Sequence, residues 1–299
     1  MRCDFHFTPE GWRISEVNTD FLGGFIEASD FTELMAPYFP RYKPPPNPAM
    51  AYAAAIRKTV GENALIGIVR RPSISRYRGI KCVAREIRRQ GMRLVILKPG
   101  QVKWRSNQAT FVEPYDTATP DLLIRWLNVQ KLPTLLPEGQ WKPWFCGGRT
   151  RMSNPGSCVL TQGKRFPLVW DNLRTPISTW RSLLPETRSI GEVPTGSERE
   201  WVFKSFFGAA GAEVAIAGVT DEGALKRMFR QARQNPAGWI AQRRFESVAL
   251  PTPQGPRHIC FGVYTVDGKA VGAYTRMSTK PLVDGYAEEI AVLIRGDRT

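Results

Sequence analysis

Residues 2–18 read RCDFHFTPEGWRISEVN, two stretches of alternating polar and apolar residues on either side of a Pro-Glu-Gly turn. This pattern predicts a β-hairpin. Side chains alternate between the faces of a strand, so Arg2 and Asp4 share one face of the first strand. Glu16 and Asn18 likewise share one face of the second. Strand pairing can gather these four polar side chains into a cluster, which is costly to bury unless a cation or ligand satisfies it.

A second region follows the proline-rich break at residues 44–46. Residues 65–69 and 91–97 read as buried strands, and residues 80–90 between them read as a helix. This strand-helix-strand order predicts a small α/β domain with parallel strand pairing. Residues 121–126 supply a further strand.

The rest of the chain alternates helical and strand patterns around a loop of small residues. We predict, in order, a helical region at 164–184, a strand at 201–204, a loop at 205–212, a strand at 213–216, a helix at 221–234, a strand at 239–246 and a hairpin at 258–265 and 270–277. The predicted fold class is therefore α/β.

Composition excludes several classes of site. Five widely spaced cysteines without a Cys-x-x-Cys pair argue against a disulfide framework and a zinc site, and two histidines exclude a histidine-rich metal centre. The longest apolar runs are far shorter than the roughly 20 residues of a membrane-spanning helix. The amino terminus has no apolar signal-peptide core. These features predict a cytoplasmic protein that does not enter a membrane.

A net charge of +15 predicts an anionic partner, which can be a nucleotide, a polyphosphate or a nucleic acid. The arginines are scattered, and the densest groups, at 70–78 and 85–89, lie on or beside an amphipathic helical stretch. We interpret them as a solvated face. Binding to nucleic acid rests on charge alone and is the less favoured alternative.

Lys204 precedes the small-residue loop 205–212, which reads SFFGAAGA. Backbone N–H groups of such a loop can approach phosphate oxygens while the lysine adds a point charge. The loop is no P-loop, because no Gly-Lys-Ser or Gly-Lys-Thr follows. A glycine-rich connection with a purely structural role remains an alternative.

Taken together, Arg2-x-Asp4, Glu16-x-Asn18-x-Asp20 and the segment 23–28, GGFIEA, resemble the glutathionylspermidine synthetase family. The resemblance implies an ATP-grasp site in which Mg²⁺ is held by Asp4, Glu16 and Asn18. It also implies that Arg2 stabilises the transferring phosphoryl group. The turn at 21–24, FLGG, departs from the Thr-Pro-Ser-containing turn of that family.

The resemblance continues downstream in chain order. It implies that ATP is bound by side chains and loop glycines at five positions, Lys164, Lys204, Gly208, Gly211 and Gln242, and that Arg276 is catalytic. The loop departs from the family pattern at Ala209 and Ala210, where the family has arginine and glutamate. The chain also begins at the Arg-x-Asp strand, whereas the family has a long segment before it.

The resemblance implies an ATP-grasp fold in circularly permuted order with an inserted small α/β domain. Its expected parts are a metal and phosphate hairpin at 1–30, the small α/β domain at 31–155 and the nucleotide-binding subdomains at 156–299. The implied activity is an ATP-dependent carboxylate–amine ligase that forms an amide through an acyl phosphate. Expected partners are ATP, Mg²⁺, a peptide or glutathione-like carboxylate and an amine such as a polyamine. The alternative is an ATP-binding or polyanion-binding protein of the same fold with impaired catalysis.

Overall fold

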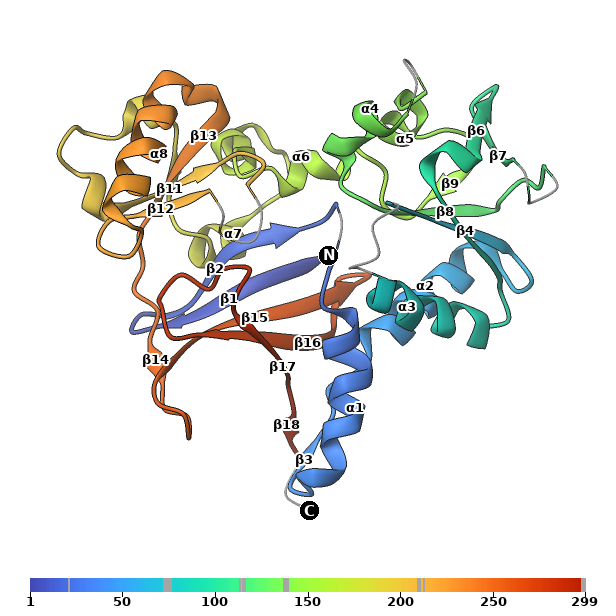
Figure 1. Cartoon of the computed structure of the whole chain (residues 1–299), viewed down its shortest axis with the longest axis horizontal. Helices are drawn as coiled ribbons and strands as arrows, with labels where there is room; N and C mark the ends of the chain where they lie inside the picture. Colours follow the sequence, from blue (N-terminus) through green and yellow to red (C-terminus); the bar gives the residue numbers. More distant parts are fainter. Residues whose placement is uncertain are drawn as a thin grey trace.

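The computed structural model describes residues 1–20, 22–71, 77–112, 114, 117–136, 140–208, 211 and 213–296. A central antiparallel sheet lies between two lobes (Figure 1). Its strand order is β17-β16-β15-β1-β2, with β14 paired to β15. The strands are β1 (Arg2–Thr8), β2 (Gly11–Asn18), β14 (Ala249–Leu250), β15 (Arg257–Val266), β16 (Lys269–Ser278) and β17 (Glu288–Ala291).

The predicted amino-terminal hairpin is confirmed, and so is its grouping of polar residues. Arg2 lies opposite Asn18, and Asp4 lies opposite Glu16. The pairing register shifts after Asp4 and leaves Ser15 opposite no residue of β1, which makes a β-bulge. The predicted carboxyl-terminal hairpin is also confirmed as β15 and β16, and β1 pairs with β15. Strands from the two ends of the chain therefore form one sheet.

The first lobe, called the small lobe below, holds a parallel sheet of order β5-β4-β8-β9, which confirms the predicted parallel pairing. Alternate residues of β4 point to two different cores: Ile66 and Ile68 pack with helices α2 and α3, whereas Leu65 and Val69 pack against Trp144 and its neighbours. The elements of this lobe are α2 (Pro48–Val60), β4 (Leu65–Arg70), α3 (Tyr77–Arg89), β5 (Arg93–Leu97), β6 (Val102–Arg105), β7 (Gln108–Phe111), β8 (Leu122–Trp126), α4 (Leu132–Leu135), α5 (Lys142–Cys146) and β9 (Arg151–Met152).

Helix α2 is an element that the sequence analysis did not predict, because the prolines before it read as a break. Asn47 caps it: its Oδ1 accepts hydrogen bonds from the backbone N–H groups of Ala49 and Met50 at 3.0 and 3.1 Å. Pro48 occupies the first turn, where a missing N–H costs nothing. The Asn-Pro pair was the signal of a helix start.

The second lobe holds an antiparallel sheet of order β10-β13-β11-β12 with α8 against it. Its strands and main helix match the predicted pattern, although β13 ends at Arg243 rather than at 246. The predicted helical region at 164–184 contains a 3₁₀ helix, η6, and a short helix, α7, separated by a segment that contains Pro176. A proline restricts the residue before it to extended conformations, so the helical run is interrupted.

The elements from residue 158 to residue 243 are α6 (Cys158–Gln162), η6 (Phe166–Asn172), α7 (Ser178–Leu183), β10 (Thr187–Arg188), η7 (Ile190–Glu192), η8 (Glu198–Glu200), β11 (Trp201–Ser205), β12 (Val214–Ile216), α8 (Glu222–Gln234), η9 (Pro236–Gly238) and β13 (Trp239–Arg243).

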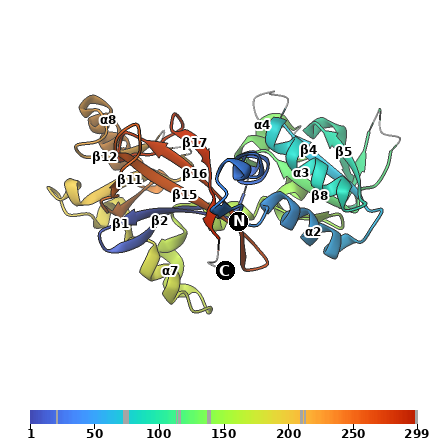
Figure 2. The same ribbon diagram turned by 90° about the horizontal axis from the view of Figure 1, so that it is seen from below.

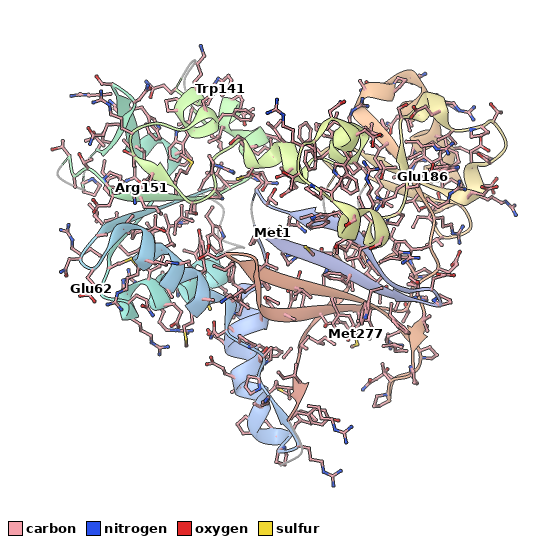
Figure 3. The ribbon with its side chains drawn as sticks, turned by 180° about the vertical axis from the view of Figure 1, so that it is seen from behind. Met1, Glu62, Trp141, Arg151, Glu186 and Met277 are labelled. Carbon is pink, nitrogen blue, oxygen red and sulfur yellow. The ribbon has the colours of Figure 1, made fainter. Side chains whose placement is uncertain are left out.

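A third group of elements extends downward from the central sheet in Figure 1, and Figure 2 shows the molecule from that side. It comprises the π-helix η1 (Glu27–Phe31), α1 (Thr32–Met35), η2 (Ala36–Tyr38), and β3 (Tyr42–Lys43) paired with β18 (Ile294–Arg295). Elsewhere in the chain there are two further 3₁₀ turns, η4 (Pro99–Gln101) and η5 (Val129–Lys131). Figure 3 places Met1 at the centre of the molecule, between the lobe that carries Trp141 and the lobe that carries Glu186. In the described part of the chain no helix is long and apolar enough to cross a membrane.

A buried ion pair joins the end of the hairpin to the small lobe. Arg125 on β8 pairs with Asp20, and their side chains are 0% and 1% exposed. Asp20 also accepts a hydrogen bond from the backbone N–H of Val129 at 3.2 Å. The backbone N–H of Asp20 in turn donates to Gln162 Oε1 at 2.7 Å. The segment after β2 is therefore fixed both to β8 and to α6.

Replacing Arg125 by methionine leaves the Asp20 carboxylate buried without a counter-charge. We expect this to lower the free energy of unfolding by about 3–5 kcal/mol, the range for breaking a buried pair. The control is Arg233→Met, because the side chains of Arg233 and its partner Glu198 are 61% and 24% exposed and such surface pairs contribute at most about 1 kcal/mol. Urea denaturation of both variants measures the difference, and equal losses would contradict this assignment.

Candidate active site

Arg2 and Asp4 form a bidentate ion pair inside the central sheet. Arg2 Nε and Nη2 donate to Asp4 Oδ1 and Oδ2 at 2.7 and 2.8 Å. The two residues are 7% and 1% exposed. Arg276 on β16 donates from Nη2 to Asp4 Oδ2 at 3.3 Å, so one buried carboxylate holds two guanidinium groups. A bidentate pair fixes the plane of a guanidinium as well as its position.

The loop after β2 also helps to hold Arg2. Arg2 Nη1 donates to the carbonyl of Gly23 at 3.1 Å, and the hydroxyl of Tyr264 donates to the same oxygen. The next residue, Gly24, has φ +83°, and a Cβ there would lie 2.7 Å from Tyr264 and Tyr274. Glycine is therefore required at 24 for the loop to reach Arg2.

Glu16, Asn18 and Lys164 lie beside this pair. Asn18 Nδ2 donates to both Glu16 Oε1 and Asp4 Oδ2 at 3.4 Å. Lys164, which follows α6, has its Nζ 3.9 Å from Glu16 Oε2 and donates to the carbonyl of Gly208. Burial favours a raised pKa for Glu16, but the surrounding cations, Lys164 first, hold that pKa below its ordinary value.

The bulge in β2 creates a contact for the second lysine. Ser15 lies opposite no residue of β1 in the strand register, and its carbonyl accepts a hydrogen bond from Lys204 Nζ at 3.0 Å. Lys204 Nζ also donates to Gln242 Oε1 at 2.6 Å. Burial, aided by the charge of Lys164, lowers the pKa of Lys204 to about 8. An anion placed between the two lysines would relieve this repulsion.

Three cavities meet at this cluster: one of about 310 Å³, lined in part by Glu16, Lys164, Lys204 and Gln242, and two that also reach Arg276. The larger of these two, of about 520 Å³, is lined by Arg2, Glu16, Asn18, Lys164, Gly208 and Arg276. The smaller, of about 100 Å³, is lined by Glu16, Lys164, Lys204, Gly211, Gln242 and Arg276. All predicted site residues therefore line one or both cavities, with the exception of Asp4, which lies behind Arg2. Glu16, Lys164 and Arg276 are shared by both.

The three predicted metal ligands, Asp4, Glu16 and Asn18, are not equally able to bind a cation. Glu16 and Asn18 line the larger cavity and can present oxygen atoms to it. Both oxygens of Asp4 instead accept hydrogen bonds from arginines, and Asp4 is buried. Among the residues that the structure describes, no group of three or more His, Cys, Asp or Glu side chains is arranged to hold a metal ion. The geometry suits Mg²⁺ held by Glu16, Asn18 and ligand phosphates, with Asp4 as the support of the arginines.

Some residues of the cavity were not predicted as site residues. Glu27 and Glu289 line it from η1 and β17, and Arg78 lines it from α3. Glu289 carries no local sequence signal, because its place depends on the pairing of β17 with β16. Several positions discussed above, Phe21, Arg76, Ala209 and Ala210, lie outside the described residues.

The Glu27 and Glu289 carboxyl groups lie close together. Burial, followed by the neighbouring Glu289 carboxyl, raises the pKa of Glu27 to about 7. Glu289 lies opposite Arg276 in the strand register, and β17 also contacts η1. A pair of carboxyl groups that shares a proton near neutral pH is typical of a site that binds or transfers a proton.

Similarity to known proteins is limited to the fold. No protein-family model matches the chain, and no curated protein matches it. A similar solved structure is that of a protein from Methylobacillus flagellatus KT provisionally assigned as a gamma-glutamylcysteine synthetase. It superposes with a TM-score of 0.61 at 12% sequence identity, and covers 97% of this chain and 79% of that one. At this identity the comparison shows a shared mixed α/β fold.

The raised pKa of Glu27 makes stability depend on pH. In the unfolded chain Glu27 loses its proton from about pH 4.5, whereas in the folded chain it keeps the proton up to about pH 7. Glu27 therefore lowers the free energy of unfolding progressively as the pH rises from about 4.5 to 7. We expect Glu27→Gln to stabilise the protein at pH 8 by about 1 kcal/mol, discounted for its partial exposure, and to change little at pH 4. Chemical denaturation at both pH values checks this. A gain of equal size at pH 4 would contradict it.

Proposed function

We propose that this chain is an ATP-dependent carboxylate–amine ligase with an ATP-grasp architecture in circularly permuted order, similar to glutathionylspermidine synthetase. The observation that carries the proposal is the convergence of four basic side chains on the junction of the cavities. Arg2, Lys164, Lys204 and Arg276 come from four separate parts of the chain, and Glu16 lies among them. Such a cluster suits a polyphosphate with Mg²⁺ better than a single phosphate.

The cavity of about 310 Å³ suits the nucleoside part of ATP in size, whereas the one of about 100 Å³ is too small for it. Apart from the polar side chains of Lys164, Lys204 and Gln242, the lining of the 310 Å³ cavity includes apolar and aromatic side chains of η6, α7 and β13: Phe166, Trp170, Trp180 and Ile240. The larger cavity, of about 520 Å³, then lies on the phosphate side and accommodates the other two substrates. Glu16, Lys164 and Arg276 would meet the phosphates where the cavities join.

The proposed chemistry needs no protein nucleophile. A substrate carboxylate oxygen attacks the γ-phosphorus of ATP, the bond to the β-phosphate oxygen breaks, and ADP leaves with that electron pair. The nitrogen of a neutral amine then attacks the acyl carbon, phosphate leaves with the electron pair of the broken C–O bond, and loss of one proton from the nitrogen to solvent gives the amide. Mg²⁺, when bound, would neutralise phosphate charge. Arg2 and Arg276 are held by Asp4 where they can stabilise charge on the transferring group.

The activity is tested by ADP release. We expect ADP to form only when ATP, Mg²⁺, a carboxylate and an amine are all present, with glutathione as the first carboxylate probe and spermidine or an amino acid as the amine. ATP binding without substrate-dependent ADP release would contradict ligase activity and favour the alternative of an ATP-binding protein with impaired catalysis.

Removal of the proposed metal ligands should weaken the effect of Mg²⁺ on ATP binding. In the double variant Glu16→Gln with Asn18→Ala, one ligand loses its charge and the other is deleted. We expect the gain in ATP affinity on adding Mg²⁺ to fall by about tenfold, the equivalent of one charged contact. Calorimetric titration with and without Mg²⁺ measures it. An unchanged Mg²⁺ effect would remove the metal assignment.

Arg2 should matter more for turnover than for ATP binding, because catalysis depends on interactions that strengthen in the transition state. We expect Arg2→Lys to leave ATP affinity within a few-fold of the parent while turnover falls by roughly a hundredfold. The reason is that a lysine ammonium cannot form the two parallel hydrogen bonds of a planar guanidinium. Steady-state kinetics and ATP titration on the same preparation separate the two effects. A parallel loss of binding and turnover would show that Arg2 has another role.

A further inference from the structure

One side of the larger cavity is built by three elements that pack together, η1, β17 and α3. Asp30 of η1 accepts hydrogen bonds from Arg85 of α3, and Cys82 of α3 has its Sγ 3.9 Å from the carbonyl of Phe25. β17 contacts η1 from the central sheet. Each element supplies one charged side chain to the cavity: Glu27, Glu289 and Arg78.

The two carboxyl groups lie close to the proposed phosphoryl end. Glu289 is the cross-strand partner of Arg276, and such partners have their Cβ atoms about 4.5–5.5 Å apart. Arg276 in turn contacts Asp4, which holds Arg2. A positively charged group bound between Glu27 and Glu289 would therefore lie beside the position of an acyl phosphate held by the two arginines.

Arg78 brings a positive charge to the same side of the cavity. It lies four residues, about 6 Å along the helix axis, before Cys82, whose Sγ faces the backbone just ahead of Glu27. With the residues that the structure describes, Arg78 forms no hydrogen bond or ion pair. Gln130 also lines this cavity, and its Oε1 is buried without a hydrogen-bond partner among the described atoms. Among the described residues, the cavity thus offers a guanidinium and an amide oxygen that have no hydrogen-bond partner, together with a carboxyl pair.

We propose that this side of the cavity binds the amine substrate, and that this substrate is a zwitterion of the α-amino-acid type. Its ammonium group binds Glu27 and Glu289, and its carboxylate binds Arg78. The proposal rests on the ligase function proposed above and names the class of its acceptor. A guanidinium pairs well with a carboxylate, whereas it repels the additional ammonium groups of a polyamine. The structure therefore favours an amino acid over a polyamine as acceptor.

The test measures binding of three probes by ligand-detected NMR at pH 7. L-alanine has both charged groups, L-alaninamide lacks the carboxylate, and spermidine is a polycation. We expect the parent to bind L-alanine at least about tenfold more tightly than L-alaninamide, the value of one charge-assisted contact. Tighter binding of spermidine or of L-alaninamide than of L-alanine would overturn the inference.

Variants then assign the two charged groups of the ligand. Arg78→Gln should weaken L-alanine binding about tenfold and leave L-alaninamide unchanged, whereas Glu27→Gln with Glu289→Gln should weaken both. The matched control is Arg88→Gln, because Arg88 is an exposed arginine on the same helix that does not line the cavity. Equal affinity for L-alanine in Arg78→Gln and the control would show that Arg78 is not the carboxylate site. The ADP-release assay on the same samples tests the ligase function separately, so failure of one proposal is distinguishable from failure of the other.

Discussion

The ion pair between Arg2 and Asp4 is the interaction on which the site depends. A lone carboxylate or guanidinium could not remain charged inside the central sheet, because desolvation would cost several kcal/mol. Each residue makes the burial of the other tolerable, and Asp4 has enough acceptor capacity left to hold Arg276. The fold can therefore place two guanidinium groups at the wall of a cavity with little freedom to move. Rigid placement of this kind is what charge stabilisation in catalysis requires.

The geometry around this pair depends on two departures from regular structure. The β-bulge at Ser15 frees a carbonyl that contacts Lys204 across the junction of the central sheet and the second lobe. Gly24 allows the loop after β2 to pass close to Tyr264 and Tyr274 and to place the Gly23 carbonyl on Arg2. Bulges and close backbone approaches are common at functional sites, where they direct groups that a regular strand would point elsewhere.

Local pattern was sufficient to predict the hairpin, the parallel sheet of the small lobe and the grouping of Arg2, Asp4, Glu16 and Asn18, because strand alternation fixes which side chains share a face. It failed at α2, whose start the preceding prolines concealed, and it did not locate the break at Pro176 within the predicted helical region 164–184. Glu289 could not be predicted as a cavity residue, since its position follows from the register of two strands. The sequence also could not predict that both Arg2 and Arg276 hydrogen-bond to Asp4, because these contacts depend on long-range packing.

The central claim is that phosphoryl transfer to a carboxylate takes place at the junction of the cavities. Its most direct test is oxygen transfer: glutathione labelled with ¹⁸O in its carboxylates is incubated with ATP, Mg²⁺ and L-alanine or spermidine, and the phosphate released is analysed by mass spectrometry. An acyl-phosphate pathway predicts that each phosphate formed with ADP carries one ¹⁸O atom from the peptide. ADP formation accompanied by unlabelled phosphate would mean that water is the acceptor, and would contradict the account.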